Sequence, residues 1–551
     1  MKKTTLLLLV SLMVSQTMTQ WVNNYWGNNT SDNQIQNSKG LAVATDHNGN
    51  CYVTGYTVNP ETGSDIILIK YNEAGDTLYS KIYTGTGNGE DRAFGIAVDE
   101  YDNVYITGQI SMTGRGLELI VLKYNKYGNL LWTKTYGATN QNMDDAGLAI
   151  TLDHYNRPYV TGFCTSQDGA RKIVTIRFNT YGNTAWVKIE DGPGSMDSQG
   201  FGIAVDETDN IYVTGYVTTT TGKDIIIIKY SQNGIEKWIE IQDGAASEDD
   251  VAYGIAFDAN NKLYVTGYTT VDSSQNNTDV VLMKVTPSGN VNWVKTYSGG
   301  SGISSDKAFG IIVDNENRVY ITGETSNSSQ GKNYLTLKYN TAGIKQWSSV
   351  YNGPGNGDDY ANAINLLSNK VVVTGASWGT GENFDYATLN LNKNNGNLSS
   401  LTRYSFSGNS NDIAKDVAVS NNNTIYVTGY SELVVNNKIT NSAISTMMIK
   451  DNDREQNSGT TNTPEQFSLN QNYPNPFNPS TTIKFSIGIN CQVNLVVFDM
   501  MGKEVDIIVN NELAAGEYSI TYTNKNLSSG IYFYSLSAGS FKDVKKMTII
   551  K

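Results

Sequence analysis

The sequence predicts an all-β fold built from one repeated sheet unit, and two observations support this. The tetrapeptide Tyr-Val-Thr-Gly or a close variant occurs eight times in the 551 residues, at intervals of 52 to 56 residues. This period is too long for a helical or leucine-rich solenoid and is typical of a small sheet repeated around an axis. Each copy is also followed by a run of apolar, β-branched residues of strand length. We therefore expect an eight-bladed β-propeller. The copies end at Gly55, Gly108, Gly162, Gly215, Gly267, Gly323, Gly375 and Gly429.

Four strands are expected in each unit, and the fourth unit shows the pattern. Residues 201–206, 211–216 and 224–230 are apolar or β-branched runs separated by polar turns. The third run is apolar on both faces, so it needs cover on both sides, which stacked blades provide. A turn containing Gly234 then leads into a fourth strand around Trp238. Turn glycines recur at this place in the other units, where a positive φ angle is the simplest explanation.

The ring is expected to close through the N-terminus. The eighth unit ends with its third strand, at residues 445–450, and then passes into polar sequence. Residues 21–27 precede the first complete unit and are similar to residues 293–299, which belong to a fourth strand. We expect this N-terminal strand to complete the eighth blade, so that no sheet edge is left open.

The two ends of the chain have their own compositions. Residues 1–20 carry two lysines followed by the apolar run 6–14, which is typical of a secretory signal peptide and too short for a permanent membrane span. No later segment reaches transmembrane length. We therefore divide the chain into a signal peptide, a propeller at 21–450, a polar linker at 451–466 and a C-terminal domain at 467–551.

Composition argues against several function classes. The net charge is −13 with dispersed lysines and arginines, so nucleic acid is not an expected partner. Three cysteines are an odd number for an exported chain and do not suggest a disulfide framework. The two histidines, His47 and His154, both fall in predicted turns, which argues against histidine-based triads and histidine-rich zinc sites. No catalytic residue and no cofactor are predicted.

Acidic residues precede the innermost strand of five units, and two interpretations are open. The carboxylates could surround one mouth of the central channel and bind a cation such as calcium. Alternatively, each accepts amide hydrogen bonds in its own loop and repeats only because the blade repeats. Asp144 and Asp197 lie one step off this register. The five candidates are Asp91, Asp250, Asp306, Asp359 and Asp412.

A second acidic series opens the turn between the first and second strands of six units. The spacing only loosely suggests a calcium loop, because the central glycine and terminal glutamate of an EF-hand are missing. Turn formation by the aspartate side chains is the better interpretation. The series is Asp46, Asp99, Asp153, Asp206, Asp258 and Asp314.

The repeat units resemble the SBBP-type β-propeller repeat of exported bacterial proteins, over roughly residues 21–450. The spacing of Gly128 and Trp132 is also similar to the docking motif of eight-bladed quinoprotein dehydrogenases. This chain departs from that family in lacking its acidic turn start and its adjacent-cysteine element. The shared pattern therefore favours shared blade packing, without a shared cofactor.

The C-terminal residues form the most specific pattern in the chain. Short alternating strands with turn residues between them predict a small Ig-like β-sandwich at 467–551. This segment resembles the type A C-terminal sorting domain of type IX secretion, the Por secretion tail. The resemblance implies passage through the outer membrane by the type IX machinery, a system of the Bacteroidetes and their relatives, and a secreted or cell-surface location. The motif residues are Tyr473, Pro474, Asn475, Pro476, Phe477, Asn478, Pro479, Gly502, Gly530, Lys546 and Lys551.

Two classes of function follow from these observations. The first is a non-catalytic exported protein whose propeller loops, rich in Tyr and Asn, bind a glycan or another surface protein. The second is an exported enzyme that acts on polysaccharide through carboxylates at the channel mouth, which requires no histidine. The longest irregular loop, residues 271–279, carries mainly Ser, Asn and Gln instead of clustered Glu and Arg. This favours binding.

Overall fold

The computed structural model describes most of the chain. The described residues are 18–27, 37–137, 143–193, 196–272, 277–300, 304–327, 331–381, 383–406, 410–435, 438–450, 467–472, 475–477, 480–487, 491–513, 516–523, 527–539 and 541–550. Residues 1–17 of the predicted signal peptide (1–20) and the predicted linker lie outside these ranges, as do Tyr473, Pro474, Asn478, Pro479 and Lys551 of the sorting motif. The last three residues of that predicted signal peptide, 18–20, belong to the first strand. Two compact units are present, the first ending at Asp451 and the second beginning at Asn452.

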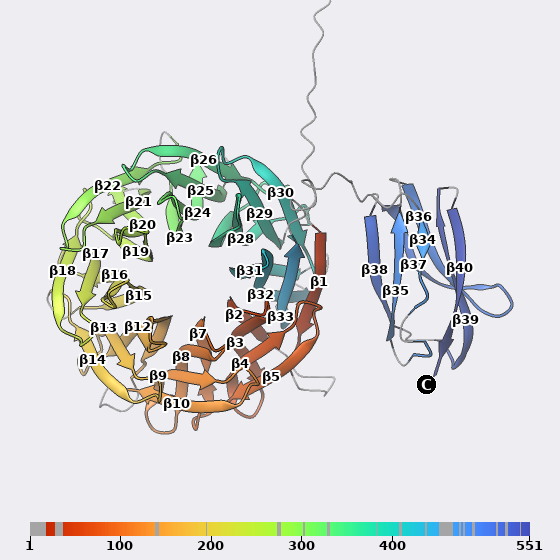
Figure 1. Cartoon of the computed structure of the whole chain (residues 1–551), viewed down its shortest axis with the longest axis horizontal. Helices are drawn as coiled ribbons and strands as arrows, with labels where there is room; N and C mark the ends of the chain where they lie inside the picture. The colour runs from red at the N-terminus through yellow and green to blue at the C-terminus, as the bar shows by residue number, and fades with distance from the viewer. Residues whose placement is uncertain are drawn as a thin grey trace, which may run out of the picture. The chain divides into compact units, whose positions relative to one another are not determined.

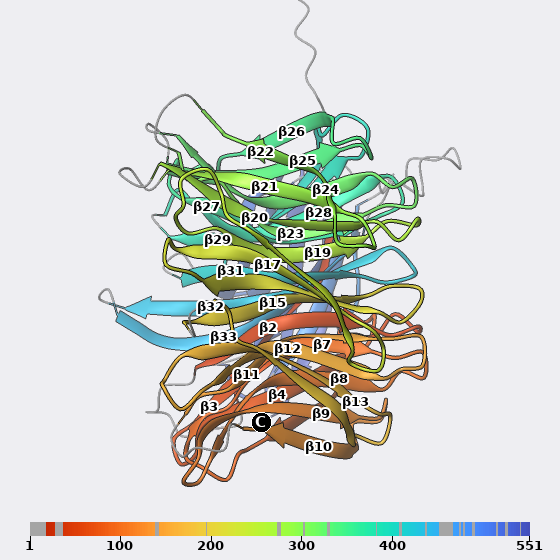
Figure 2. The same ribbon diagram turned by 90° about the vertical axis from the view of Figure 1, so that its left-hand side faces the viewer.

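The described part of the chain is all β. Every regular element in it is a strand, and it contains no helix long and apolar enough to cross a membrane. The first unit is a β-propeller, in which antiparallel four-stranded sheets surround a common centre (Figure 1). Seen from the side, the strands run across the ring from one face to the other (Figure 2).

Each propeller sheet has an innermost strand next to the centre and a second strand paired with it. The innermost strands are β2 (Ser38–Thr45), β7 (Arg92–Val98), β11 (Ala146–Leu152), β15 (Ser198–Val205), β19 (Val251–Phe257), β23 (Lys307–Val313), β27 (Asp359–Leu366) and β31 (Ser410–Val419). The second strands are β3 (Cys51–Asn59), β8 (Val104–Met112), β12 (Pro158–Thr165), β16 (Ile211–Thr218), β20 (Leu263–Asp272), β24 (Val319–Asn327), β28 (Lys370–Trp378) and β32 (Thr424–Val435).

A third and a fourth strand complete each sheet toward the rim. The third strands are β4 (Gly63–Tyr71), β9 (Gly116–Tyr124), β13 (Arg171–Phe178), β17 (Lys223–Tyr230), β21 (Asn277–Val285), β25 (Gly331–Tyr339), β29 (Phe384–Asn392) and β33 (Lys438–Lys450). The fourth strands are β5 (Thr77–Tyr83), β10 (Leu130–Tyr136), β14 (Thr184–Glu190), β18 (Glu236–Gln242), β22 (Val291–Tyr297), β26 (Lys345–Tyr351), β30 (Leu398–Tyr404) and, from the N-terminus, β1 (Met18–Tyr25).

The ring closes through both ends of the repeat region. The innermost strands contact one another in the order β2, β7, β11, β15, β19, β23, β27 and β31, and β31 contacts β2. β1 pairs antiparallel with β33, with Val22 opposite Met447, as the sequence predicts for the N-terminal strand. The indole of Trp21 also donates a hydrogen bond to the Glu73 carbonyl in the first sheet, at 3.1 Å. β1 therefore completes the last sheet and fastens it to the first.

The recurring tetrapeptide is explained residue by residue in β16. The Tyr212 hydroxyl donates to Asp206 in the preceding turn, at 3.1 Å. The Thr214 hydroxyl donates to a carbonyl of β17, at 3.0 Å. A Cβ at Gly215 would lie 1.8 Å from the Gln199 carbonyl oxygen of β15, so only glycine fits between these strands. The turn interpretation of the second acidic series is thereby confirmed for Asp206.

The turn glycine and the outer-strand tryptophan connect neighbouring sheets. The Trp238 indole of β18 donates to the Pro287 carbonyl in the turn of the next sheet, at 3.1 Å. In that turn a Cβ at Gly289 would lie 2.9 Å from the same indole. Lys229 reaches the same Pro287 carbonyl and stands over the Tyr212 ring at 4.8 Å. The Gly-Trp pattern is accounted for by packing between sheets.

The second unit contains two sheets that share one hydrophobic core. Its three-stranded sheet has the order β34 (Ser468–Leu469), β35 (Ser480–Ile487) and β38 (Gly516–Thr523). Its four-stranded sheet has the order β37 (Glu504–Leu513), β36 (Cys491–Phe498), β39 (Gly530–Ala538) and β40 (Phe541–Ile549). Ile483 and Phe485 of the first sheet and Leu495 and Leu536 of the second are buried in this core.

Candidate functional site

The five predicted acidic candidates are buried between sheets instead of being exposed around the centre. Their side chains belong to residues that are at most 1% exposed. Asp91 accepts amide hydrogen bonds from Gly85 and Ser111, both at 2.6 Å. Asp359 accepts them from Gly353 and Trp378, at 2.7 and 2.8 Å. Each of these carboxylates ties the loop after one outer strand to the next sheet, which is the loop-stabilising geometry. Asp250, Asp306 and Asp412 also accept a loop amide.

Burial changes the acidity of these carboxyl groups. It raises the pKa of Asp91 to about 6, and the amide hydrogen bonds from Ser111 and Gly85 oppose the rise. The pKa of Asp250, Asp359 and Asp412 is raised for the same main reason. Each of the five is therefore a buried carboxylate that is engaged by its own loop.

The third sheet places a different aspartate at this position from the one singled out in the sequence. Asp145 is 1% exposed and accepts the Thr165 amide at 2.7 Å, whereas Asp144 is exposed. The strand pairing shows the reason, because Ala149 occupies the position that Gly95 has in β7, and Gly147 lies two residues earlier. In the fourth sheet the position belongs to Ser198, which is buried, and not to Asp197.

The two histidines lie in turns, as predicted. A ring nitrogen of His47 lies 3.1 Å from Asp102, and one of His154 lies 3.2 Å from Asp209. Both histidine side chains are more than half exposed. Each pair joins the turns between innermost and second strands of two neighbouring sheets and gathers no further metal ligand among the described residues.

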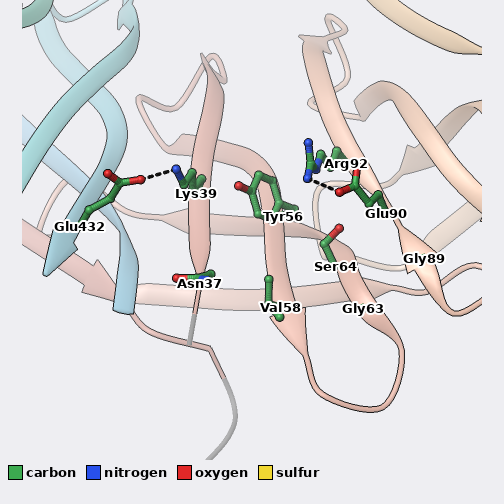
Figure 3. A pocket seen from close by; sticks show the side chains of 10 residues that line it. All are labelled: Asn37, Lys39, Tyr56, Val58, Gly63, Ser64, Gly89, Glu90, Arg92 and Glu432. Atoms are coloured by element: carbon green, nitrogen blue, oxygen red, sulfur yellow. Dashed lines mark hydrogen bonds and ion pairs between the residues drawn. The ribbon is translucent and has the colours of Figure 1, made fainter. Parts of the chain in front are cut away.

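A groove at one end of the first sheet brings together polar groups from several strands (Figure 3). Its volume is about 550 Å³. Lys39 comes from β2, Tyr56 from β3 and Glu432 from β32. Arg92 begins β7, and Glu90 belongs to the two-residue strand β6 (Gly89–Glu90), which pairs with β4. Three neighbouring sheets therefore supply its side chains.

Charges in the groove are paired across the sheets. Lys39 forms an ion pair with Glu432, and Arg92 forms one with Glu90 at 2.8 Å, as Figure 3 shows. The Arg92 guanidinium stands over the Tyr56 ring at 5.0 Å. Burial raises the pKa of Tyr56, and Arg92 partly opposes this, so the phenol stays protonated near neutral pH. The site offers donors, acceptors and one aromatic face.

The chemistry of this groove suits binding. A ligand with several hydroxyl groups can exchange hydrogen bonds with the guanidinium, the ammonium and both carboxylates. Both carboxylates are held in ion pairs, and the groove lining has no serine or cysteine next to a histidine. Sequence reasoning did not single out these residues. The available signal was that Lys39 and Arg92 occupy the place where Gln199 and Val251 stand in later sheets.

In the second unit, the described sorting-motif residues hold the two ends of the domain together. The Asn475 side chain donates to the Lys546 carbonyl at 3.1 Å and accepts the Thr548 amide at 2.8 Å. Phe477 is 2% exposed and its amide donates to the Thr548 carbonyl at 3.0 Å. Gly502 has a φ of 77° in the turn after β36. Residues 475–477 are therefore joined by hydrogen bonds to β40, the last strand of the domain.

Comparison with known families identifies this second unit. Residues 471–551 match the family described as secretion system C-terminal sorting domain. This confirms the sorting-domain prediction at the level of the family. The match indicates sorting by the type IX secretion system to the cell surface or outside the cell.

The other similar proteins are more distant. An uncharacterized WD repeat-containing protein of Acanthamoeba polyphaga mimivirus is 23% identical over 355 residues, which are 54% of this chain and 24% of that protein. The chain thus spans about a quarter of that relative's length. The quinohemoprotein alcohol dehydrogenase of Comamonas testosteroni is 9% identical with a TM-score of 0.49, covering 83% of this chain and 78% of that one. Sqt1 of Chaetomium thermophilum is 6% identical with a TM-score of 0.46, covering 78% and 100%.

Proposed function

We propose that this chain is an exported or cell-surface protein whose propeller binds a glycan without catalysis. In this proposal the first unit is an eight-bladed β-propeller of SBBP-type repeats, closed by β1. The second unit is an Ig-like β-sandwich that directs the chain through type IX secretion. The order of innermost strands, with β31 returning to β2, supports the blade number, and the sorting-domain match supports the route of export.

The groove of Figure 3 carries the binding proposal. It combines the Tyr56 ring with two ion pairs whose donors and acceptors border one cavity. Aromatic rings present an apolar face to the C–H face of a sugar, and charged pairs satisfy its hydroxyl groups. The aspartates considered for the polysaccharide-active alternative are buried and bonded to loop amides, which favours recognition over cleavage.

A glycan array tests the proposal. Purified full-length chain is incubated with bacterial and plant glycans, and bound protein and released reducing ends are read from the same wells. We expect binding without new reducing ends. Tyr56→Ala and Arg92→Gln should each weaken binding at least about 10-fold, because both remove central contacts of the groove.

Two matched variants control for folding and position. Tyr216 follows the motif glycine in β16 as Tyr56 does in β3, and Lys307 begins β23 as Arg92 begins β7. Tyr216→Ala and Lys307→Gln should leave glycan binding unchanged, with folding verified by circular dichroism. Release of reducing ends would overturn the non-catalytic assignment. Equal loss in the groove variants and the controls would overturn the placement of the site.

A further inference from the structure

Three aspartates from one junction between sheets bring their carboxylates together outside the groove. Asp224 is in β17, Asp243 follows β18, and Asp250 immediately precedes β19. One carboxylate oxygen from each lies within 4.8 Å of the other two. Asp224 and Asp250 are 4% and 1% exposed, and Asp243 is exposed. Three like charges at this separation repel one another unless a cation lies among them.

One of these carboxylates has an oxygen without a partner. Asp224 Oδ1 is buried and accepts no hydrogen bond. Its side chain has a hydrogen bond with the Thr219 hydroxyl. A buried acceptor left unsatisfied costs about 1–3 kcal/mol, more when it is charged. An oxygen that is buried next to two further carboxylates is suited to ligate a cation.

Asp250 is held in position by its own loop. Its two carboxylate oxygens accept the amides of Gly244 and Thr270, which leaves further lone pairs on both. Gly244 must be glycine, because a Cβ there would lie 2.6 Å from Asp250 and 2.3 Å from the Thr269 hydroxyl. Among the described ion pairs none involves Asp224, Asp243 or Asp250, while the adjacent Lys223 pairs with Asp249.

The preceding junction shows how the same positions look when the chain supplies the positive charge itself. Lys172 lies opposite Cys164, two residues after the motif glycine of β12, as Asp224 lies opposite Val217 in the next sheet. Lys172 forms an ion pair with Asp191, which corresponds to Asp243. The position of Asp250 is taken there by Ser198. One junction thus holds a lysine, an aspartate and a serine, and the other holds three aspartates.

Two of the three aspartates, Asp243 and Asp250, border a cavity. A cavity of about 280 Å³ is lined by Asp243, Gly244 and Asp250 together with Thr269. Asp243 is exposed, so a hydrated ion can reach the buried pair through it. Oxygen-only ligands, two of them buried and one exposed, match the preference of Ca²⁺ for six to eight oxygens in irregular geometry.

We propose that Asp224, Asp243 and Asp250 bind one Ca²⁺ ion and that this ion fastens sheet β15–β18 to sheet β19–β22. The ion replaces the ammonium of Lys172 at the preceding junction. It bridges an outer-strand loop, a third strand and the start of the next innermost strand. This inference does not depend on glycan binding, because the groove lies at a different junction.

Calorimetric titration of CaCl₂ into the full-length chain, freed of metal with a chelator, tests the site. We expect a site with a dissociation constant of about 10⁻⁴ to 10⁻³ M, as in extracellular calcium modules, and a thermal midpoint that rises with calcium. Asp243→Asn, at an exposed position that tolerates change, should weaken this binding at least about 10-fold by removing a charged ligand. Asp224→Lys copies the preceding junction and should abolish the binding while making the thermal midpoint independent of calcium.

Asp191→Asn is the matched control, because Asp191 holds the corresponding position beside Lys172. It should leave calcium binding unchanged. Calcium binding of equal affinity in the unmodified chain, Asp243→Asn and Asp224→Lys would overturn the proposal. So would the absence of both heat and thermal shift at calcium concentrations of about 10 mM, well above the range of such sites.

Discussion

Sheets β15–β18 and β27–β30 have the same strand order but stabilise their first turn with opposite chemistry. In the first sheet Asp206 accepts the Tyr212 hydroxyl at 3.1 Å, and Lys229 lies 4.0 Å from the same carboxylate. In the second sheet Leu367 and Val372 occupy the places of Asp206 and Tyr212. All five of these residues are buried.

The difference teaches that the aspartate and the lysine are replaced together. Asn390 stands where Lys229 stands, since each lies opposite the first residue of the tetrapeptide. Its side chain donates to Ser400 at 3.0 Å, and Ser400 replaces the outer-strand tryptophan. Removing one partner of a buried ion pair strongly lowers the free energy of unfolding, because the other charge stays buried without a partner. Replacing both partners by apolar side chains avoids this loss. In the eighth sheet Ser420 and Met448 likewise take both places, although Tyr426 is kept.

The largest expected effect concerns the last propeller sheet, in which β31, β32 and β33 are completed by β1 from the N-terminal end of the chain. Deleting residues 18–27 removes β1, leaves β33 as an open edge and removes the contact of Trp21 with the first sheet. We expect the thermal midpoint to fall by about 10 °C or more, since several kcal/mol of pairing and burial are lost. Differential scanning calorimetry measures it. An unchanged midpoint would contradict closure through β1.

A smaller effect sharpens the contrast between the two opening sheets. Asp206→Leu leaves the Lys229 ammonium buried without its carboxylate, which should destabilise the sheet by about 3 kcal/mol. The double variant Asp206→Leu/Lys229→Met replaces both partners and should recover at least half of that loss. Hydrogen exchange at the amides of β16 and β17 provides the measurement. A double variant less stable than the single one would show that the Asp206 carboxylate and the Lys229 ammonium cannot be replaced together by apolar side chains.

Turn glycines are common to both sheets and give the next effect. Gly234 has a φ of 75°, and a Cβ there would lie 2.8 Å from the Trp186 ring of the preceding sheet. Gly234→Ala should destabilise the propeller by about 2–4 kcal/mol, as strain and overpacking add. Gly169→Ala is the control, because Gly169 has a φ of 87° with nothing within 4 Å. It should cost about 1–2 kcal/mol. Equal thermal shifts would show that the tryptophan contact contributes nothing.

The smallest expected effect concerns the first residue of the innermost strand in each of the two sheets. β27 begins with Asp359 and β15 with Ser198. Burial raises the pKa of Asp359 above its ordinary value, and amide hydrogen bonds and Arg403 oppose the rise. The native state therefore keeps this proton to a higher pH than the unfolded chain does. Its contribution to stability is present below the ordinary aspartate pKa and decreases as the pH rises through the raised value.

Asp359→Ser gives β27 the residue of β15 and tests this dependence. The variant should be less stable at every pH, because the Gly353 and Trp378 amides lose their acceptor. Its thermal midpoint should fall less steeply than that of the unmodified chain as the pH rises from about 4 to 7. Calorimetry across this range checks the slope. A steeper fall in the variant would contradict the assigned direction.

Much of the fold could be predicted because each repeat carries local signals. The runs at 211–216 and 224–230 became β16 and β17 with end shifts of one or two residues. The N-terminal strand was predicted from its similarity to a fourth strand, and β1 pairs with β33. Asp145 was missed because Ala149 stands where β7 has Gly95, so no glycine marks this position in the third unit.

The groove and the aspartate cluster could not be predicted in the same way. Lys39 and Glu432 are 393 positions apart in the chain and meet only where the ring closes. The aspartates before the innermost strands looked equivalent in the sequence, yet Asp250 lies beside Asp224 and Asp243, whereas the acidic group that raises the pKa of Asp91 is Asp65. Which charges face one another across a junction depends on the neighbouring sheet.

The sequence by itself determined the repeated sheet, its turns and the sorting domain, because alternation, turn glycines and motif spacing act within a few residues of each other. The tertiary structure alone decided which side chains become neighbours between sheets. Burial then set the acidity of Asp91 and left Asp224 with an unpaired oxygen. Electrostatic interactions act through space, so a ring of similar units acquires individual sites only when its sheets are packed together.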